Sequence, residues 1–302
     1  MSRTRFLLRG LLQLFVGAAC VVGAVALVKF AIHPWIARTL SLEQGASGAV
    51  RRWGIFVAVV LSYWAFVRYY ERRPVSELAP RAKWFLLALA AGSASIGVTI
   101  LILYATGNYE LVAFLGFARV ASVMVTIWIA AFLEEVVFRG LLLRILEERL
   151  GTRTALAGSA AIFGILHMSN DGARTITLFS VTLAGLMWAG VFLISRNLWV
   201  AAAHHAAWNA TIFLSGVPLS GEDWRASAPL ETVYRGSTFW TGGVFGPEDS
   251  PVNIVLCLAI CIALWRVALH LRQVKPWPEI PQPTASGTAR ADLPTPSHGA
   301  PR

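Results

Sequence analysis

Three short groups of polar residues interrupt apolar segments of this chain, and each combines residue types that can do acid–base chemistry. The first is Glu134 to Arg139, Glu-Glu-Val-Val-Phe-Arg, at the end of an apolar run that starts at Val120. Carboxylates at membrane depth lose solvation that only a partner, a proton or water replaces. Such a cost predicts a functional site.

Spacing separates the two glutamates. Glu135 and Arg139 are four residues apart with the acid on the N-terminal side, which favours an intrahelical ion pair. Glu134 points about 100° away from Glu135 around a helix, so this pair does not engage it. We therefore predict a structural role for Glu135 and a chemical role for Glu134.

The other two groups repeat the spacing of four. Phe163 and His167 share one helical face, and His205 and Asn209 place two hydrogen-bonding side chains side by side, while His204 points elsewhere. A lone histidine at a helix end, or a single His–Asn pair, is just as typical of helix packing. Three such groups on three predicted helices favour convergence on one site.

Composition indicates the elements that must position these groups. The 302 residues are 56% hydrophobic and only 14% charged, which predicts an integral membrane protein. The net charge of +10 comes from basic residues between apolar runs, a pattern that suits anionic lipid head groups and not nucleic acid. Cys20, Cys257 and Cys261 lie inside apolar segments, which indicates packing and neither a disulfide nor a metal site.

Apolar runs of about twenty residues predict an all-α, polytopic transmembrane bundle of about eight helices. The expected spans are 7–32, 53–70, 84–104, 111–133, 154–168, 174–194, 197–215 and 252–272. The span 154–168 is short, so we expect it to be tilted, broken or buried among its neighbours. Basic linkers and a basic tail predict that both termini are cytoplasmic, although Arg38, Arg51 and Arg52 in the first outer connection disagree.

The same pass along the chain predicts its organisation into five parts. These are N-terminal transmembrane helices (1–110), a core that contains the three motifs (111–215), an extracytoplasmic or interfacial loop (216–250), the last transmembrane helix (251–272) and a disordered Pro-rich cytoplasmic tail (273–302). The loop is rich in Gly, Trp and Thr, and we expect it to act as a lid or to lie at the membrane interface.

Glu134-Glu135-Val-Val-Phe-Arg139, Phe163-Gly-Ile-Leu-His167 and His205-Ala-Ala-Trp-Asn209 together resemble the signature of the CPBP intramembrane proteases. This group contains the type II CAAX prenyl endopeptidases and the Abi, or bacteriocin-processing and immunity, proteins. The resemblance agrees in order, spacing and residue type, and it covers roughly residues 111–215.

The resemblance implies an intramembrane endopeptidase with a conical cavity that opens toward the membrane and the cytosol. It assigns Glu134 and His167 to the nucleophilic water, and His205 and Asn209 to the oxyanion, with Glu135, Arg139 and Phe163 in support. It favours a metal-free mechanism with no cofactor. Zinc held by Glu134, His167 and His205 stays an alternative, against which stands the lack of a His-Glu-x-x-His motif.

The implied partners are membrane lipids and a peptide or membrane-protein substrate, with lipidated C-terminal peptides among the candidates. Abundant Ala, Arg and Trp are typical of a GC-rich bacterium, so we expect a multi-pass protein of the bacterial inner membrane. Two other classes stay open: a scaffold or immunity protein that binds a partner in the same cavity without cutting it, and a transporter. No repeated halves support a transporter.

Overall fold

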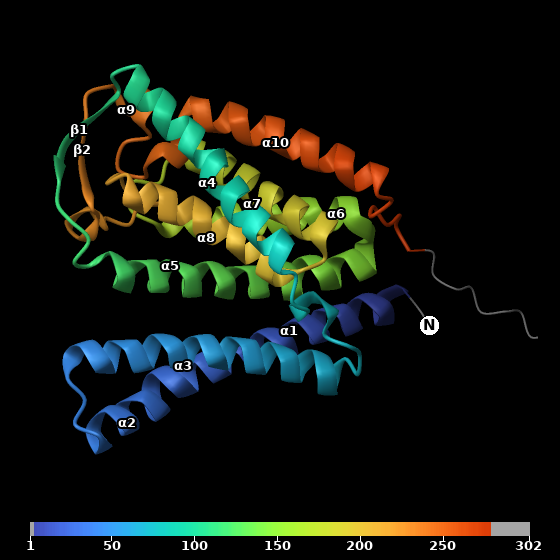
Figure 1. Cartoon of the computed structure of the whole chain (residues 1–302). Coiled ribbons are helices and arrows are strands. Elements are labelled where there is room, and N and C mark those ends of the chain that lie inside the picture. The colour runs from blue at the N-terminus through green and yellow to red at the C-terminus, as the bar shows by residue number, and fades with distance from the viewer. Residues whose placement is uncertain (1–2, 279–302) are drawn as a thin grey trace, which may run out of the picture.

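The computed structural model describes residues 3–278 and is a helical bundle with one small sheet (Figure 1). In this part of the chain, six helical segments are long and apolar enough to cross a membrane. They are Arg3–Thr39, Gln44–Tyr70, Ala82–Ala105, Val120–Ser169, Thr175–Ser195 and Pro251–His270. The predicted polytopic helical bundle is confirmed.

The first two spans form a hairpin of long helices. Helix α1 (Arg3–Leu27) continues through a π-helical turn, η1 (Val28–Ile32), into α2 (His33–Thr39), and α3 (Gln44–Ala65) continues as η2 (Phe66–Tyr70). The connection between them is therefore residues 40–43, shorter than predicted. Arg51 and Arg52, expected in that connection, lie inside α3, because the Gly- and Ala-rich segment before them contains no proline that would stop a helix.

A central helix organises the rest of the bundle. Helix α8 (Leu198–Leu214) packs against α4 (Ala82–Ala105), α5 (Val120–Glu135) and α7 (Thr175–Ser195), and nearly all of its side chains are buried. Gly92 of α4 allows a close approach to α8, because a Cβ there would lie 2.1 Å from the carbonyl oxygen of His204. This packing places His205 and Asn209 inside the protein.

The segment from 109 to 166 differs from the prediction at two places. Residues expected to begin the span 111–133 form strand β1 (Tyr109–Phe114), which pairs antiparallel with β2 (Leu230–Tyr234), and α5 starts only at Val120. The apolar run is equally suited to a strand, so hydropathy alone misplaced this helix start.

The second difference is that the chain does not leave the helix after Arg139. It continues as the π-helix η4 (Val136–Leu143) into α6 (Arg144–Leu166), which ends in the turn η5 (His167–Ser169). The predicted linker around Arg144 and Arg149 is therefore helical. The expected short span 154–168 is the second arm of α6, which begins where Gly151 breaks the helix at φ +73°.

Figure 1 shows the α1–α3 hairpin on one side of α5, with α4, α6, α7, α8 and α10 (Pro251–His270) on the other. The segment 216–250 contains η6 (Arg225–Ser227), β2, α9 (Thr238–Thr241) and η7 (Pro247–Asp249), and it lies at the end of the bundle away from the N terminus. Of the tail predicted to be disordered, residues 279–302 lie outside the described residues. Lys275 before them exchanges two hydrogen bonds with Thr152.

Candidate active site

The ion pair predicted within the first motif is present and buried. Arg139 Nη1 lies 3.1 Å from Glu135 Oε1, with side chains that are 1% and 0% exposed. Arg139 also donates from Nη2 to the carbonyl oxygen of Gly185, at 2.9 Å, and its guanidinium faces the rings of Phe163 and Trp188 at 5.0 and 5.8 Å. The pair thus joins α5 and η4 to α6 and α7, which confirms the prediction that Glu135 is engaged by Arg139.

Glu134 is oriented differently. Its side chain is 33% exposed, and Oε2 lies 3.8 Å from Nε2 of His205. Successive residues of a helix differ by about 100°, so Glu134 faces a cavity while its neighbour faces the core. The π-helical turn η4 that follows both residues is a form often found at functional sites, although the first hairpin of this chain contains two others, η1 and η2.

His205 connects the two glutamates, a contact that the spacing within each motif did not predict. Its Nδ1 lies 2.9 Å from Glu135 Oε1, and since a carboxylate only accepts, Nδ1 carries the proton. The ring stacks on Trp188 with centroids 3.7 Å apart. The imidazole is therefore fixed with Nε2 directed at Glu134.

His167 is fixed in a similar way. It stands just beyond the end of α6, where Nδ1 lies 2.8 Å from the carbonyl oxygen of Phe163, and the two rings are 4.4 Å apart. The carbonyl accepts, so Nδ1 donates and Nε2 of the neutral ring is the free acceptor. The predicted shared face of Phe163 and His167 is confirmed.

These residues meet at one cavity of about 440 Å³. Glu134, Phe163, His167, His205 and Asn209 all line it, whereas Glu135 and Arg139 lie behind its wall. Segment 216–250 covers this cavity with four of the residues in its first part: Leu219, Ser220, Glu222 and Trp224. The tertiary structure thus brings the three motifs together, and His204 is buried away from them, as predicted.

Glu248 is a cavity residue that the sequence did not reveal. It is 5% exposed and accepts hydrogen bonds from Ser220 Oγ at 2.6 Å and from Trp208 Nε1 at 3.3 Å. Burial raises the pKa of Glu248, an effect that these hydrogen bonds and nearby His167 oppose. The run Glu248-Asp249-Ser250-Pro251 is typical of a helix start, which hides the role of the first acid.

Asp249 faces away from that cavity. It is buried against α7, where it accepts hydrogen bonds from Thr177 at 2.5 Å and Ser180 at 2.6 Å. These bonds hold η7 in place, so the loop that carries Glu248 is anchored to the helix bundle. Trp188, whose ring stacks on His205, is a second cavity residue that the sequence did not reveal. A lone tryptophan in an apolar helix carries no sequence signal of contact with a histidine.

Among the residues that the structure describes, no three side chains of His, Cys, Asp or Glu form a group that could hold a metal ion. His205 donates Nδ1–H to Glu135, and His167 donates Nδ1–H to a backbone carbonyl. Glu134, His167 and His205, the zinc set that the sequence left open, all line the cavity but do not form such a group.

The fold and this site define a multi-pass membrane protein with acids and imidazoles converging on a cavity among its helices. Residues 115–211 match the family model described as Rce1-like, type II CAAX prenyl endopeptidase Rce1-like. This match confirms the predicted resemblance over about a third of the chain, the part that holds all three motifs, and it supports a membrane protease. A search of the curated proteins found no match.

Proposed function

We propose that this protein is an intramembrane endopeptidase that hydrolyses peptide bonds with water activated by Glu134 and His167. The observation that carries the proposal is the contrast between two adjacent glutamates. Glu135 is enclosed by Arg139 and His205, while Glu134 faces the cavity that His167 also lines. A carboxylate within reach of a bound water can accept its proton, and an imidazole with a free Nε2 can orient that water.

His205 and Asn209 are proposed to stabilise the oxyanion of the tetrahedral intermediate. Asn209 can donate from its amide, but His205 already donates from Nδ1 to Glu135, so it donates from Nε2 only as an imidazolium. Glu135 accepts the hydrogen bond from Nδ1 at 2.9 Å, and Glu134 Oε2 lies 3.8 Å from Nε2. Glu135 therefore supports the site by orienting His205 as well as by pairing with Arg139.

We propose a peptide or membrane-protein segment as the substrate. The description of the matched family names a type II CAAX prenyl endopeptidase, and apolar side chains such as Phe138, Phe163 and Trp188 line much of the cavity, which suits a lipidated tail. Comparing peptide termini in membranes that contain the native protein or Glu134→Gln would identify substrates. A prenylated CAAX peptide assayed with both proteins tests that class directly.

The control for Glu134→Gln is Glu148→Gln, the same chemical change at a side chain that is 40% exposed and outside the cavity. We expect cleavage to vanish in the first variant and persist in the second, with both folded and membrane-inserted. Undiminished cleavage by Glu134→Gln would refute the mechanism. Partner binding that survives this change, with no product from the native protein, would favour a scaffold or immunity protein.

A mechanism without metal is also part of the proposal, supported by the lack, among the described residues, of three His, Cys, Asp or Glu side chains grouped to hold a metal ion. Purified protein is expected to keep its activity after exhaustive chelation. Complete loss of activity that zinc restores would show that the mechanism is wrong.

For the orientation, we propose that both termini are cytoplasmic in a bacterial inner membrane. Arg3 lies 5.1 Å from the ring of Trp277, so the N-terminal arm and the start of the tail share one side. The loop over the cavity lies at the other end of the bundle (Figure 1), so the cavity would open to the extracytoplasmic half. This departs from the cytosolic opening that the family resemblance implies. Labelling of Ser220→Cys from outside intact spheroplasts tests the proposed orientation, and labelling from the cytosolic side alone would reverse it.

A further inference from the structure

A second cavity, of about 520 Å³, lies at the end of the bundle that holds the N terminus. Among the residues that line it are four arginines and two glutamates: Arg9, Arg73, Arg144, Arg149, Glu71 and Glu148. It shares no residue with the cavity of Glu134, so its cationic lining has no part in the proposed proteolysis.

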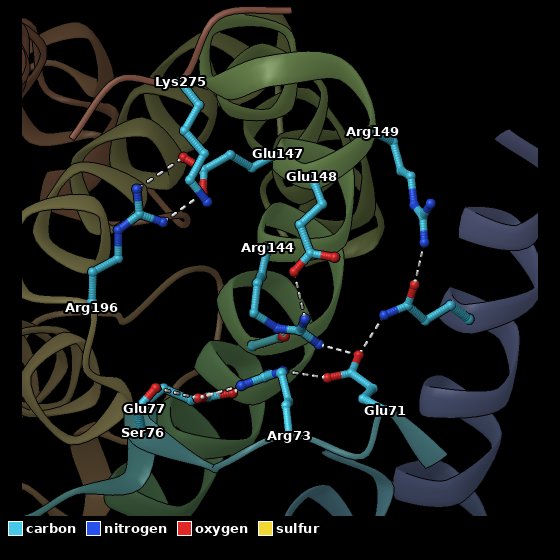
Figure 2. A network of polar contacts seen from close by, with 12 residues as sticks. Glu71, Arg73, Ser76, Glu77, Arg144, Glu147, Glu148, Arg149, Arg196 and Lys275 are labelled. Carbon is cyan, nitrogen blue, oxygen red and sulfur yellow. Dashed lines mark hydrogen bonds and ion pairs between the residues drawn. The ribbon is translucent and has the colours of Figure 1, made fainter. Parts of the chain in front are cut away.

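The two acids of this cavity are neutralised by two of its arginines. Glu71 forms ion pairs with Arg73 Nε at 2.7 Å and Arg144 Nη2 at 2.5 Å, and it accepts a hydrogen bond from Gln13 Nε2 at 2.6 Å. Arg144 also reaches Glu148, at 3.1 Å. Figure 2 shows this network spanning from the α1 side to α6. Arg73 and Arg144 are thus engaged with carboxylates.

In the part of the chain that the structure describes, Arg9 and Arg149 remain as cations without an acidic partner. Within residues 3–278, exposed Arg9 has neither a hydrogen bond nor an ion pair. Arg149 donates to the neutral Gln13 at 2.9 Å and lies 4.5 Å above the ring of Phe6, while its buried Nε has no hydrogen-bond partner in this part of the chain. Gly10 makes room for it, because a Cβ there would lie 2.9 Å from Arg149 Cγ.

An apolar surface adjoins these two cations. Leu8, Leu11 and Phe15 of α1 are 57%, 60% and 72% exposed, and Leu12 reaches from the same helix into the cavity lining. Guanidinium groups bind phosphate oxygens through several donors at once. We propose that this cavity binds the phosphate group of an anionic ligand between Arg9 and Arg149. The exposed leucines beside it indicate a glycerophospholipid whose chains lie along α1.

Native mass spectrometry of the full-length protein in a non-ionic detergent tests this site with three probes: phosphatidylglycerol, diacylglycerol and glycerol 3-phosphate. We expect the protein to bind phosphatidylglycerol and neither of the others at the same concentration. Removing both charges in Arg9→Gln/Arg149→Gln should weaken that binding about thirtyfold, because each basic residue near an anionic lipid strengthens binding about fivefold. The matched control, Arg68→Gln/Lys83→Gln, removes two exposed charges outside the cavity and should bind as the native protein does.

Equal binding of phosphatidylglycerol by the double variant and the native protein would overturn the site, as would equal binding of diacylglycerol. Binding of glycerol 3-phosphate as tight as that of the lipid would make the ligand a soluble phosphate ester and overturn the lipid assignment. If the double variant fails to fold, Arg9→Gln alone gives the test, since Arg9 is exposed and free of polar contacts within the described chain. Arg9→Lys/Arg149→Lys keeps both charges and should retain most of the binding.

Discussion

Replacing Glu135 by glutamine separates the charge of the buried network from its hydrogen bonds. Both close contacts of Glu135, with Arg139 Nη1 and His205 Nδ1, use the same oxygen, Oε1, while Oε2 has no hydrogen-bond partner in the described structure. A glutamine whose carbonyl oxygen occupies the Oε1 position keeps the hydrogen bond from His205 and the close approach to Arg139 Nη1, an atom with no hydrogen-bond partner in the described structure. What the substitution removes is the negative charge beside a guanidinium that is 1% exposed.

The expected loss of stability is about 3–5 kcal/mol, the typical cost of leaving one member of a buried ion pair without its partner. After the change, Arg139 keeps the carbonyl oxygen of Gly185 and three ring faces, all of them uncharged. Glu134 also interacts electrostatically with Arg139 and compensates part of the loss, so we expect a value toward the lower end.

Equilibrium unfolding in mixed micelles, followed by circular dichroism, measures this difference. Glu148→Gln is the matched control, because the ion pair of Glu148 with Arg144 has the same 3.1 Å separation but the Glu148 side chain is 40% exposed. We expect this control to lose less than about 1 kcal/mol of unfolding free energy. Arg139→Gln and the double variant complete a cycle in which the double change costs less than the sum of the single ones. If the unfolding free energy of Glu135→Gln lies within about 1 kcal/mol of the native value, the charge of this pair does not hold the helices together.

Three further predictions follow from the site and the fold. Asn209→Ala should lower kcat about a hundredfold or more with little change in KM, since it removes one proposed oxyanion donor; an unchanged kcat on a confirmed substrate would contradict this role. Burial raises the pKa of Glu248, so the folded state binds more protons than the unfolded state and the native protein should lose stability as pH rises above about 4.5. Glu248→Gln should lack this loss, and parallel stability profiles from pH 4 to 8 would refute it. Gly151→Ala should lower the unfolding free energy by about 1–3 kcal/mol or more, because φ +73° with ψ 166° is a conformation essentially confined to glycine and the new Cβ would lie 2.7 Å from the carbonyl oxygen of Pro276. Gly158→Ala, in the same helix with only ordinary contact at its Cβ, should be neutral or stabilising by chemical denaturation, and equal losses in both variants would contradict the backbone argument.

Contacts within one helix were predictable because the helical repeat alone determines them. A spacing of four places Glu135 against Arg139 and Phe163 against His167, whatever the rest of the protein does. Long apolar runs located α7 and α10 closely for a similar reason, since the thickness of the membrane sets the length of a spanning helix. Hydropathy failed at β1, where an apolar segment forms a strand and not the start of a helix. It also failed after Arg139, where a segment that contains arginines is helical and not a linker.

By itself, the sequence determined that the protein is a helical membrane protein, that it carries three motifs of one protease family, and that its two adjacent glutamates point in different directions. Only the tertiary structure decided that His205 donates to Glu135, seventy residues away, with Trp188 stacked on its ring. It also decided that Glu248 enters the cavity from a loop that resembles a helix start. These contacts depend on how α5, α7, α8 and η7 pack together, and packing between distant segments follows from the shape of whole helices, which no local spacing records.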